Sequence, residues 1–386
     1  MSGSQRQWFE FFAGGGMARL GLGPRWTCTF ANDISEKKAS AYRQFFGASP
    51  ELKVLDVGKL SPTDLPGTPD LAWASFPCQD LSLAGNGAGL DGERSGTFRP
   101  FWKLVSGLVA AHRAPKLVVV ENVTGTLTSH SGRDFNSIVR AFVESGYRVG
   151  ALVINAVHFL PQSRPRLFLV GFYGQGLIPE KLAASYPTKP WHTPSLIEAH
   201  SNLPERLLRN WVWWTLPIPT QGVPSLASLI ECDPTGIEWH SETETRKILQ
   251  LMSPGHRKKV TNALKLSSPI VGTIYKRTRP NVNGVMVQRA EVRFDGVSGC
   301  LRTPVGGSSR QTIIVVAKGR IRTRLLSTRE AARLMGVPDS YPLPLSYNDA
   351  YHLFGDGVVV PVVGWLENHL LQPLASSIPT SFEEVA

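Results

Sequence analysis

Short apolar runs bounded by glycine, proline or polar residues recur along the first 171 residues of the chain. Such runs are typical of buried strands, and they predict strands near residues 8–13, 27–33, 70–76, 116–123 and 166–172. Amphipathic stretches between them, at 35–46 and 95–113, predict helices. Strands alternating with helices indicate an α/β fold with a mainly parallel sheet covered on both faces. Ligands of such a sheet bind beyond the carboxyl ends of its strands.

The pattern changes after residue 171, where proline and tryptophan become frequent and the alternation of strands and helices fades. We expect a second, smaller and irregular domain there. The tryptophan-rich cluster at 211–214 is interpreted as core or domain packing rather than as a base-stacking platform. Ser327 and Glu330 have the spacing of a capping box and predict a helix start. The segment 351–371 predicts a glycine-containing loop that leads into a helix.

The composition predicts a large hydrophobic core, and the charged residues are distributed unevenly along the chain. The chain has 386 residues, 42% of them hydrophobic, and a net charge of +11. Residues 241–330 hold 18 Lys and Arg but only 5 Asp and Glu. Because binding to a polyanion releases counterions from its phosphates, this clustering predicts a nucleic-acid partner. No run of about 18 apolar residues predicts a membrane span, and the N-terminus lacks the pattern of a secretory signal.

The four cysteines, Cys28, Cys78, Cys232 and Cys300, lie far apart and form no CxxC pair. This spacing argues against a zinc site and against a disulfide framework, so we expect no metal. A reducing, cytoplasmic location is the simplest interpretation.

The glycine-rich segment FEFFAGGGMARLG places a strand, a tight turn and a helix start in succession. The third glycine of a dinucleotide-binding fingerprint is missing, because Gly16 is followed by Met17, Ala18 and Arg19. A nucleoside cofactor without a pyrophosphate therefore fits better than a dinucleotide. Asp33 follows the next strand, where a carboxylate meets ribose hydroxyls in such sheets, and Asp56 is placed to accept from an adenine amino group.

Polar side chains also lie at the ends of three further predicted strands. Cys78 comes after an apolar run and a proline, Glu121 ends a run of four apolar residues, and Arg164 and Arg166 precede another strand. A lone cysteine is more often an apolar filler, whereas a nucleophile needs nearby groups that stabilise its thiolate. A buried acid is costly unless it is paired or functional. We expect these residues to meet at one edge of the sheet. There they would form a site with a nucleophile, an acid and a pair of arginines that binds an anion.

The order of motifs resembles the DNA cytosine-5 methyltransferase family. The matching segments are FAGGG, NDI, SFPCQ, RSGTF, ENV, QSRPR, RLLSTREAARLMGVPDSY and FGDGVVVPVV, which together span nearly the whole chain. The resemblance implies a Rossmann-like sheet that uses S-adenosyl-L-methionine, and domains at 1–171 for catalysis, 172–310 for target recognition and 311–386 returning to the catalytic part. Two departures are Met17 after Gly16, and Asp356 where the family commonly has asparagine.

The resemblance implies that Cys78 adds to C6 of a cytosine flipped out of double-stranded DNA. Glu121 would hold or protonate N3, and Arg164 or Arg166 would contact O2 and orient Glu121. It implies cofactor contacts from Phe12, Ala13, Gly14, Gly16, Asp33, Ile34, Asp56, Pro77, Phe98, Asp356, Gly357 and Val358. DNA contacts are expected from Gln79, Ser82, Arg94, Lys276, Arg277 and Arg279.

Three other functions remain open at this point. An RNA cytosine methyltransferase would carry the same catalytic motifs, although the large segment before STREAARL favours DNA. A catalytically decayed DNA-binding protein is disfavoured by the intact Cys78 and Glu121. A nucleotide-dependent oxidoreductase is disfavoured by the broken dinucleotide fingerprint. We expect a monomer, acting in a restriction-modification or other phage-defence system with cognate proteins.

Overall fold

The computed structural model describes residues 5–77, 97–174, 176–281, 283–303, 310–344 and 346–377. The chain divides into two compact units. Unit 1 comprises residues 1–154, 165–218 and 358–386, and unit 2 comprises residues 155–164 and 219–357. The chain passes between the units after residues 154, 164, 218 and 357, whereas the sequence-based limits are at 171 and 310.

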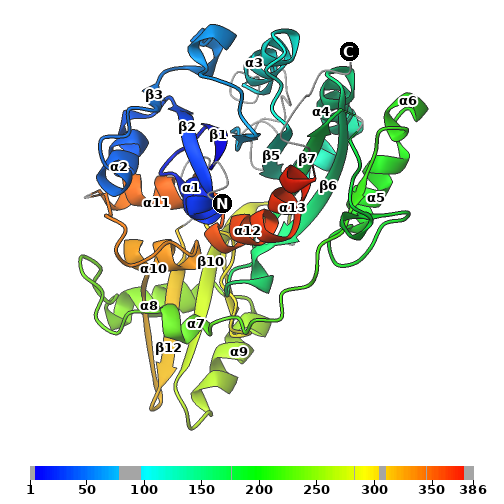
Figure 1. The fold of residues 1–386 in the computed structure, drawn as a ribbon. Coiled ribbons are helices and arrows are strands. Elements are labelled where there is room, and N and C mark those ends of the chain that lie inside the picture. Colours follow the sequence, from blue (N-terminus) through cyan, green and yellow to red (C-terminus); the bar gives the residue numbers. More distant parts are fainter. Residues whose placement is uncertain are drawn as a thin grey trace, which may run out of the picture. The chain divides into compact units, whose positions relative to one another are not determined.

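Unit 1 is built on a seven-stranded sheet in the order β3-β2-β1-β4-β5-β7-β6 (Figure 1). Its strands are β1 (Arg6–Phe11), β2 (Trp26–Asp33), β3 (Leu52–Val54), β4 (Leu71–Ala74), β5 (Leu117–Val123), β6 (Tyr147–Asn155) and β7 (Pro165–Tyr173). The strands β1 to β5 pair in parallel, while β7 pairs with β5 in the antiparallel sense. The carboxyl ends of β1 to β5 therefore lie at one edge. The predicted, mainly parallel α/β sheet is confirmed.

The helices of unit 1 cover this sheet because each buries an apolar stripe. They are α1 (Met17–Leu22), α2 (Glu36–Phe46), α3 (Phe98–Ala110), α4 (Arg133–Glu144), α5 (Pro194–Ser201), α6 (Glu205–Leu208), α12 (Val360–Leu366) and α13 (Gln372–Ser376). Phe101 and Val105 of α3 and Ile138 of α4 pack in one core with Phe9 and Val118 of the strands. The tryptophan cluster is also core, as predicted, with Trp214 fully buried.

Unit 2 contains a four-stranded antiparallel sheet in the order β11-β10-β12-β13. Its strands are β10 (Ile270–Pro280), β11 (Met286–Arg293), β12 (Thr312–Ala317) and β13 (Arg320–Leu325). The helices are α7 (Leu226–Leu229), α8 (Glu242–Gln250), α9 (Pro254–Leu264), α10 (Thr328–Leu334) and α11 (Tyr347–Asp356). Ile248 of α8 and Val260 of α9 pack against Ile274 and Ile314 in a separate core.

Two details of the sequence prediction have different outcomes here. The capping box at the start of α10 is confirmed, because the Ser327 hydroxyl accepts from the backbone N–H of Glu330, whose side chain accepts from the N–H of Ser327. The glycine-containing loop expected within 351–371 is confirmed in part, because α11 continues to Asp356 and only residues 357–359 form a loop before α12. A Cβ on Gly355 would lie only 3.1 Å from the backbone nitrogen of Thr303. This glycine allows close packing rather than a turn.

Candidate active site

The glycine-rich loop after β1 turns sharply at the carboxyl edge of unit 1. Phe12 and Gly14 have positive φ values of 58° and 56°, and Gly16, which begins α1, has a φ of 76°. A Cβ on Gly16 would lie 2.3 Å from the ring of Phe46, so only glycine fits there. The loop is fixed to β2, because the N–H of Ala13 donates to the carbonyl of Asn32 at 2.8 Å.

Asp33 holds the loop and still presents acceptor capacity. One carboxylate oxygen accepts from the N–H of Gly14 and the other from the N–H of Ser35, both at 2.8 Å. A carboxylate has about four acceptor positions, so these bonds leave room for hydroxyl donors. The neighbouring Ile34 is 71% exposed, which offers an apolar surface beside this carboxylate.

Asp56 follows β3, the strand next to β2, and lies exposed at the same edge. Its Oδ1 accepts from the N–H of Gly58 at 2.8 Å. The N–H of Leu55 donates to the carbonyl of Asp33 at 3.0 Å, which ties this strand end to the first carboxylate. The structure therefore brings the glycine loop, Asp33, Ile34 and Asp56 together, as the sequence predicts.

Behind the loop lies a buried acid that sequence reasoning missed. Glu10 of β1 is 1% exposed, and burial raises its pKa to about 8. The positive charge of Arg19 opposes this shift, while the negative charges of Asp33 and Glu51 add to it. Its Oε2 has no hydrogen-bond partner in the described part of the chain. The signal in the sequence was an acid inside the apolar run of β1.

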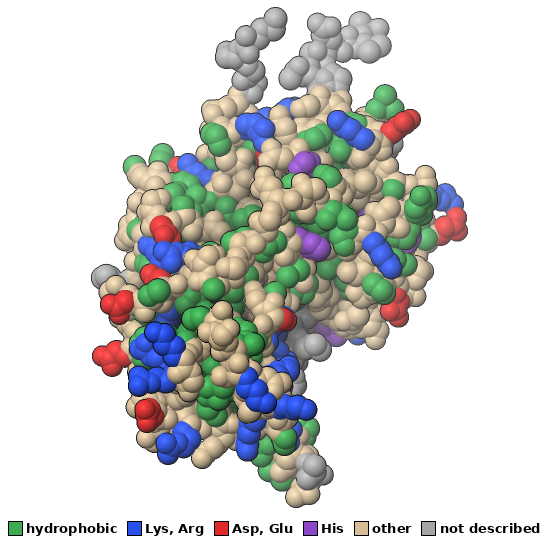
Figure 2. Space-filling model, turned by 90° about the horizontal axis from the view of Figure 1, so that it is seen from below, with side chains coloured by type: hydrophobic (Ala, Val, Ile, Leu, Met, Phe, Trp, Pro, Cys, Tyr) green, Lys and Arg blue, Asp and Glu red, His purple; other side chains and the backbone are tan. Residues whose placement is uncertain are grey.

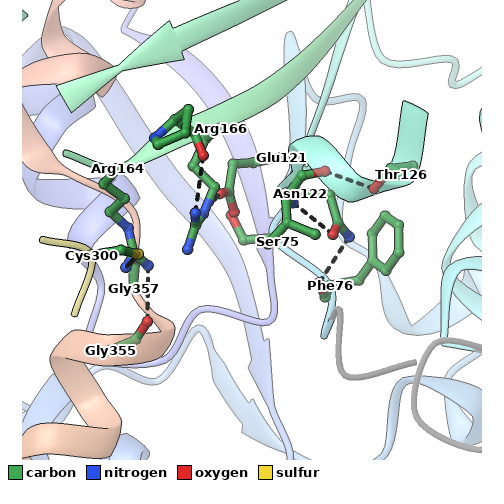
Figure 3. A network of polar contacts seen from close by, with 12 residues as sticks. Ser75, Phe76, Glu121, Asn122, Thr126, Arg164, Arg166, Cys300, Gly355 and Gly357 are labelled. Carbon is green, nitrogen blue, oxygen red and sulfur yellow. Dashed lines mark hydrogen bonds and ion pairs between the residues drawn. The ribbon is translucent and has the colours of Figure 1, made fainter. Parts of the chain in front are cut away.

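Glu121 and Arg166 form an ion pair on two adjacent strands (Figure 3). Arg166 lies opposite Val123 in the antiparallel register of β5 and β7, so it reaches diagonally to Glu121 on the same face. The Nε of Arg166 lies 3.2 Å from Oε1 of Glu121, and the two side chains are only 16% and 7% exposed. A carboxyl and a guanidinium are thus held together at the end of β5.

Asn122, which the sequence prediction did not assign, joins β5 to the segment that follows β4. Its amide donates to the carbonyl of Phe76 at 3.2 Å, and its side-chain oxygen accepts from the N–H of Val123 at 2.8 Å (Figure 3). Phe76 comes two residues before Cys78. Cys78 itself lies outside the described residues, as do Gln79, Ser82 and Arg94. The asparagine of the ENV motif could have been recognised as a polar residue at a buried strand end.

Arg164 and Arg166, only two positions apart, have different surroundings. Arg164 belongs to unit 2 and is 2% exposed. Its guanidinium donates to the carbonyls of Leu301, Gly355 and Gly357 at 2.7–2.8 Å (Figure 3). It therefore clamps two backbone segments within that unit, at residue 301 and at 355–357. Gln162 adds to this clamp, since its amide donates to the carbonyl of Leu334 and its oxygen accepts from the N–H of Leu301.

The remaining predicted cofactor residues are Phe98, Pro77, Asp356, Gly357 and Val358. Phe98 is 3% exposed and packs against Phe76 and Trp102 in the core. Pro77 is exposed at the end of a described segment. Asp356 is exposed at the end of α11 and Gly357 follows it in unit 2, whereas Val358 is buried and begins the last part of unit 1.

The predicted DNA-binding residues of the basic segment lie on β10. Arg277 is exposed and its Nε lies 3.5 Å from a carboxylate oxygen of Glu291. Lys276 is half-buried, and the side chain of Arg279 lies outside the described residues. Among the residues described, no cluster of acidic, histidine and cysteine side chains could hold a metal ion. Within the same residues, no helix is both long and apolar enough to span a membrane.

Comparisons with solved structures agree with this architecture. The S. pombe Dnmt2 methyltransferase aligns with a TM-score of 0.56 at 16% identity, covering 96% of this chain and 99% of the other. A putative DNA modification methyltransferase from an Escherichia coli prophage aligns with a TM-score of 0.52 at 18% identity, covering 96% and 99% of the two chains. At these identities the likeness shows the fold.

Sequence comparison reaches the same family. The chain is 24% identical over 371 residues to Type II methyltransferase M1.ScrFI of Lactococcus lactis subsp. cremoris, covering 95% of this chain and 78% of the relative. It is 26% identical over 357 residues to Type II methyltransferase M.NgoBI of Neisseria gonorrhoeae, covering 92% and 89%. The model of the C-5 cytosine-specific DNA methylases matches residues 7–371. The chain therefore belongs to the C-5 cytosine-specific DNA methylase family, as an enzyme that depends on S-adenosyl-L-methionine.

Proposed function

We propose that this enzyme methylates C5 of a cytosine flipped out of a specific double-stranded DNA sequence, through a covalent bond between Cys78 and C6. The observation that carries the proposal is the buried Glu121–Arg166 pair at the end of β5, 3.2 Å between Nε and Oε1. Asn122, the next residue, is hydrogen-bonded to Phe76, two residues before the cysteine. An acid and the segment leading to a nucleophile are thus tied to one strand end.

The glycine loop and the two acids fit an adenosine-type cofactor. Asp33 has acceptor positions left for ribose hydroxyls, Ile34 offers an exposed apolar face to adenine, and Asp56 carries a second carboxylate oxygen for its amino group. The bend at Gly14 and Gly16 lets the backbone approach the methionine end closely. When bound, S-adenosyl-L-methionine supplies the methyl group. Phe98, buried in the core, is not assigned a contact.

The chemistry follows from the weak nucleophilicity of cytosine C5. The thiolate of Cys78 adds to C6 and places electron density on C5, while the Glu121 carboxyl holds a proton at N3. Arg166 keeps Glu121 in place and offers N–H donors to O2. After C5 has taken the methyl group, loss of the C5 proton and release of Cys78 from C6 restore the ring. Arg164 has a structural role and does not contact the base, because its guanidinium donates to backbone carbonyls.

Unit 2 is proposed to recognise the target sequence. Its basic segment around β10 and β11 supports phosphate contacts by Lys276, Arg277 and Arg279. The target C6 is buried in stacked DNA, so the base must leave the helix at a cost of a few kcal/mol. The names of the relatives, Type II methyltransferases, support a role in a restriction-modification system.

Expression of the chain in a bacterial host without cytosine methylation tests this function. Bisulfite conversion of the host DNA is expected to leave cytosines unconverted at one recurring sequence. The Cys78→Ser variant is expected to leave none. Complete conversion with the unaltered enzyme, or a methyl group on the exocyclic nitrogen, would overturn the proposal.

A further inference from the structure

A long segment of unit 2 carries no acidic residue. From residue 245 to residue 290 the chain has ten Lys and Arg and no Asp or Glu over 46 residues. This segment includes most of α8, all of α9 and β10, and most of β11. Lys and Arg side chains also gather over the lower half of Figure 2. The positive charge of unit 2 is therefore concentrated in residues 245–290, and the strands and helices of this segment determine which way each side chain points.

The segment places positive charge on both faces of the sheet. Ile274 and Ala290 pack with Val260 of α9, so they point toward the helix. Because side chains alternate along a strand, Arg277 and Arg289 point to the opposite face. The 3.5 Å contact of Arg277 with Glu291, which lies between the buried Ala290 and Val292, agrees with this alternation.

The face with Arg277 adjoins the segment that holds Arg164. Tyr275, two residues earlier and therefore on the same face, fills the space beside Gly299, where a Cβ would lie 0.9 Å from its hydroxyl. Leu301, two residues on, accepts from the Arg164 guanidinium at 2.8 Å. The phosphate contacts proposed for Arg277 place the substrate duplex on this face of the unit 2 sheet.

The outer side of α9 is a separate basic surface, which we call the α9 surface and define as Lys258, Lys259 and Lys265. All three are exposed, and none makes a hydrogen bond or ion pair within the described part of the chain. The helix packs against β11 and β12 on the face that carries Ile274 and Ala290, whereas Arg277 and Arg289 point to the opposite face. A duplex bound at Arg277 and Arg289 therefore lies on the other side of the sheet from the α9 surface.

We infer that the α9 surface binds the phosphate backbone of a second DNA duplex while the first occupies the catalytic side. The inference rests on the proposed function, and charge complementarity selects the occupant, since three unpaired lysines on a segment without acids fit a polyanion. An enzyme that holds two duplexes can pass from one DNA segment to another without dissociating from both at once. Because each lysine neutralises at most one phosphate, the second contact is weak and salt-dependent.

A two-duplex capture experiment tests this inference. A 30-bp duplex carrying the sequence found by bisulfite conversion is fixed to beads, and a fluorescent 30-bp duplex of unrelated sequence is added with the enzyme. The unaltered enzyme is expected to bring fluorescence to the beads. The triple variant Lys258→Gln, Lys259→Gln and Lys265→Gln is expected to lower this capture at least about tenfold, because a salt slope of about 3 is lost. The matched Lys→Arg triple variant is expected to retain it.

Methylation of the short duplex in solution separates the possible failures. The glutamine variant is expected to methylate it at the rate of the unaltered enzyme. An equal loss of methylation would place the lysines on the catalytic duplex and overturn the inference, as would capture that is absent or unaffected by the substitutions. Failure of the unaltered enzyme to methylate any DNA would instead overturn the proposed function.

Discussion

Each unit holds an arginine–glutamate pair that joins two adjacent strands, and these two pairs differ in their surroundings. In unit 1 the Glu121–Arg166 pair joins adjacent strands with side chains 7% and 16% exposed. In unit 2 the Arg277–Glu291 pair also joins adjacent strands, but its side chains are 44% and 34% exposed. Exposed pairs contribute about 0–1 kcal/mol and are screened by salt, whereas buried charges must stay paired. The first pair therefore fixes geometry for chemistry, and the second leaves its arginine available to a ligand.

The largest contrast is expected from removing the two glutamates in turn. Glu121→Gln should lower kcat by about a thousandfold, because general acid–base groups contribute roughly 10²–10⁴. Glu291→Gln, the matched change in unit 2, should leave kcat unchanged and tighten DNA binding slightly by releasing Arg277. Single-turnover methyl transfer measures both effects. Equal effects of the two substitutions would remove the distinction between the pairs.

The two arginines of the QSRPR motif should separate stability from catalysis. Arg164→Lys should lower the free energy of unfolding by about 2–4 kcal/mol, because a charged hydrogen bond is worth about 1.5–3 kcal/mol and a lysine ammonium would replace only part of the bonds to the three carbonyls. Arg166→Lys should lower kcat, and it should lower the free energy of unfolding by less than Arg164→Lys does. Urea unfolding and methyl-transfer rates, measured on both variants, check this. A larger stability loss for Arg166→Lys would reverse the assignment.

Buried titratable side chains in unit 1 should also make the free energy of unfolding depend on pH. Burial raises the pKa of Glu10 to about 8, while the unfolded chain has an ordinary value of about 4.3. Between these values the folded state holds a proton that the unfolded state lacks, so stability falls as pH rises. Burial lowers the pKa of His192 to about 4, and its opposing effect ends near pH 6.5.

Unfolding in urea between pH 6.5 and 8 therefore isolates Glu10. The unaltered enzyme should lose up to about 1.4 kcal/mol per pH unit from this group. Glu10→Gln should flatten that dependence, and Glu291→Gln serves as the control for losing a surface charge. An unchanged slope in Glu10→Gln would show that another group carries the effect.

The smallest effect is expected from two arginines of unit 2, the exposed Arg277 and the half-buried Arg289. Arg277→Gln combined with Arg289→Gln should weaken DNA binding and lower the slope of log affinity against log salt by about 2. The rate at saturating DNA should stay unchanged, because neither side chain lies in the catalytic pair. Fluorescence anisotropy over a series of salt concentrations measures the slope. An unchanged slope would move the phosphate contacts elsewhere.

The same contrast explains what the sequence predicts and what it conceals. The strands of unit 1 are buried on both faces and appear as apolar runs such as LVVVENV, so their positions and the acid at residue 121 are visible. The strands of unit 2 alternate apolar side chains with arginines, as in RIRTRL, and this pattern conceals the sheet among basic loops. The clamp around Arg164 depends on carbonyls from Leu301 and Gly355, which are distant in sequence and carry no signal.

Trapping of the covalent intermediate tests the central claim most directly. Double-stranded DNA containing the methylated sequence, made with 5-fluorocytosine in place of cytosine, is incubated with enzyme and S-adenosyl-L-methionine. The fluorine cannot leave C5 as a proton does, so the adduct is expected to persist on a denaturing gel with the unaltered enzyme and to be absent from Cys78→Ser. An adduct of equal yield in Cys78→Ser, or none with an enzyme that methylates ordinary DNA, would contradict the account.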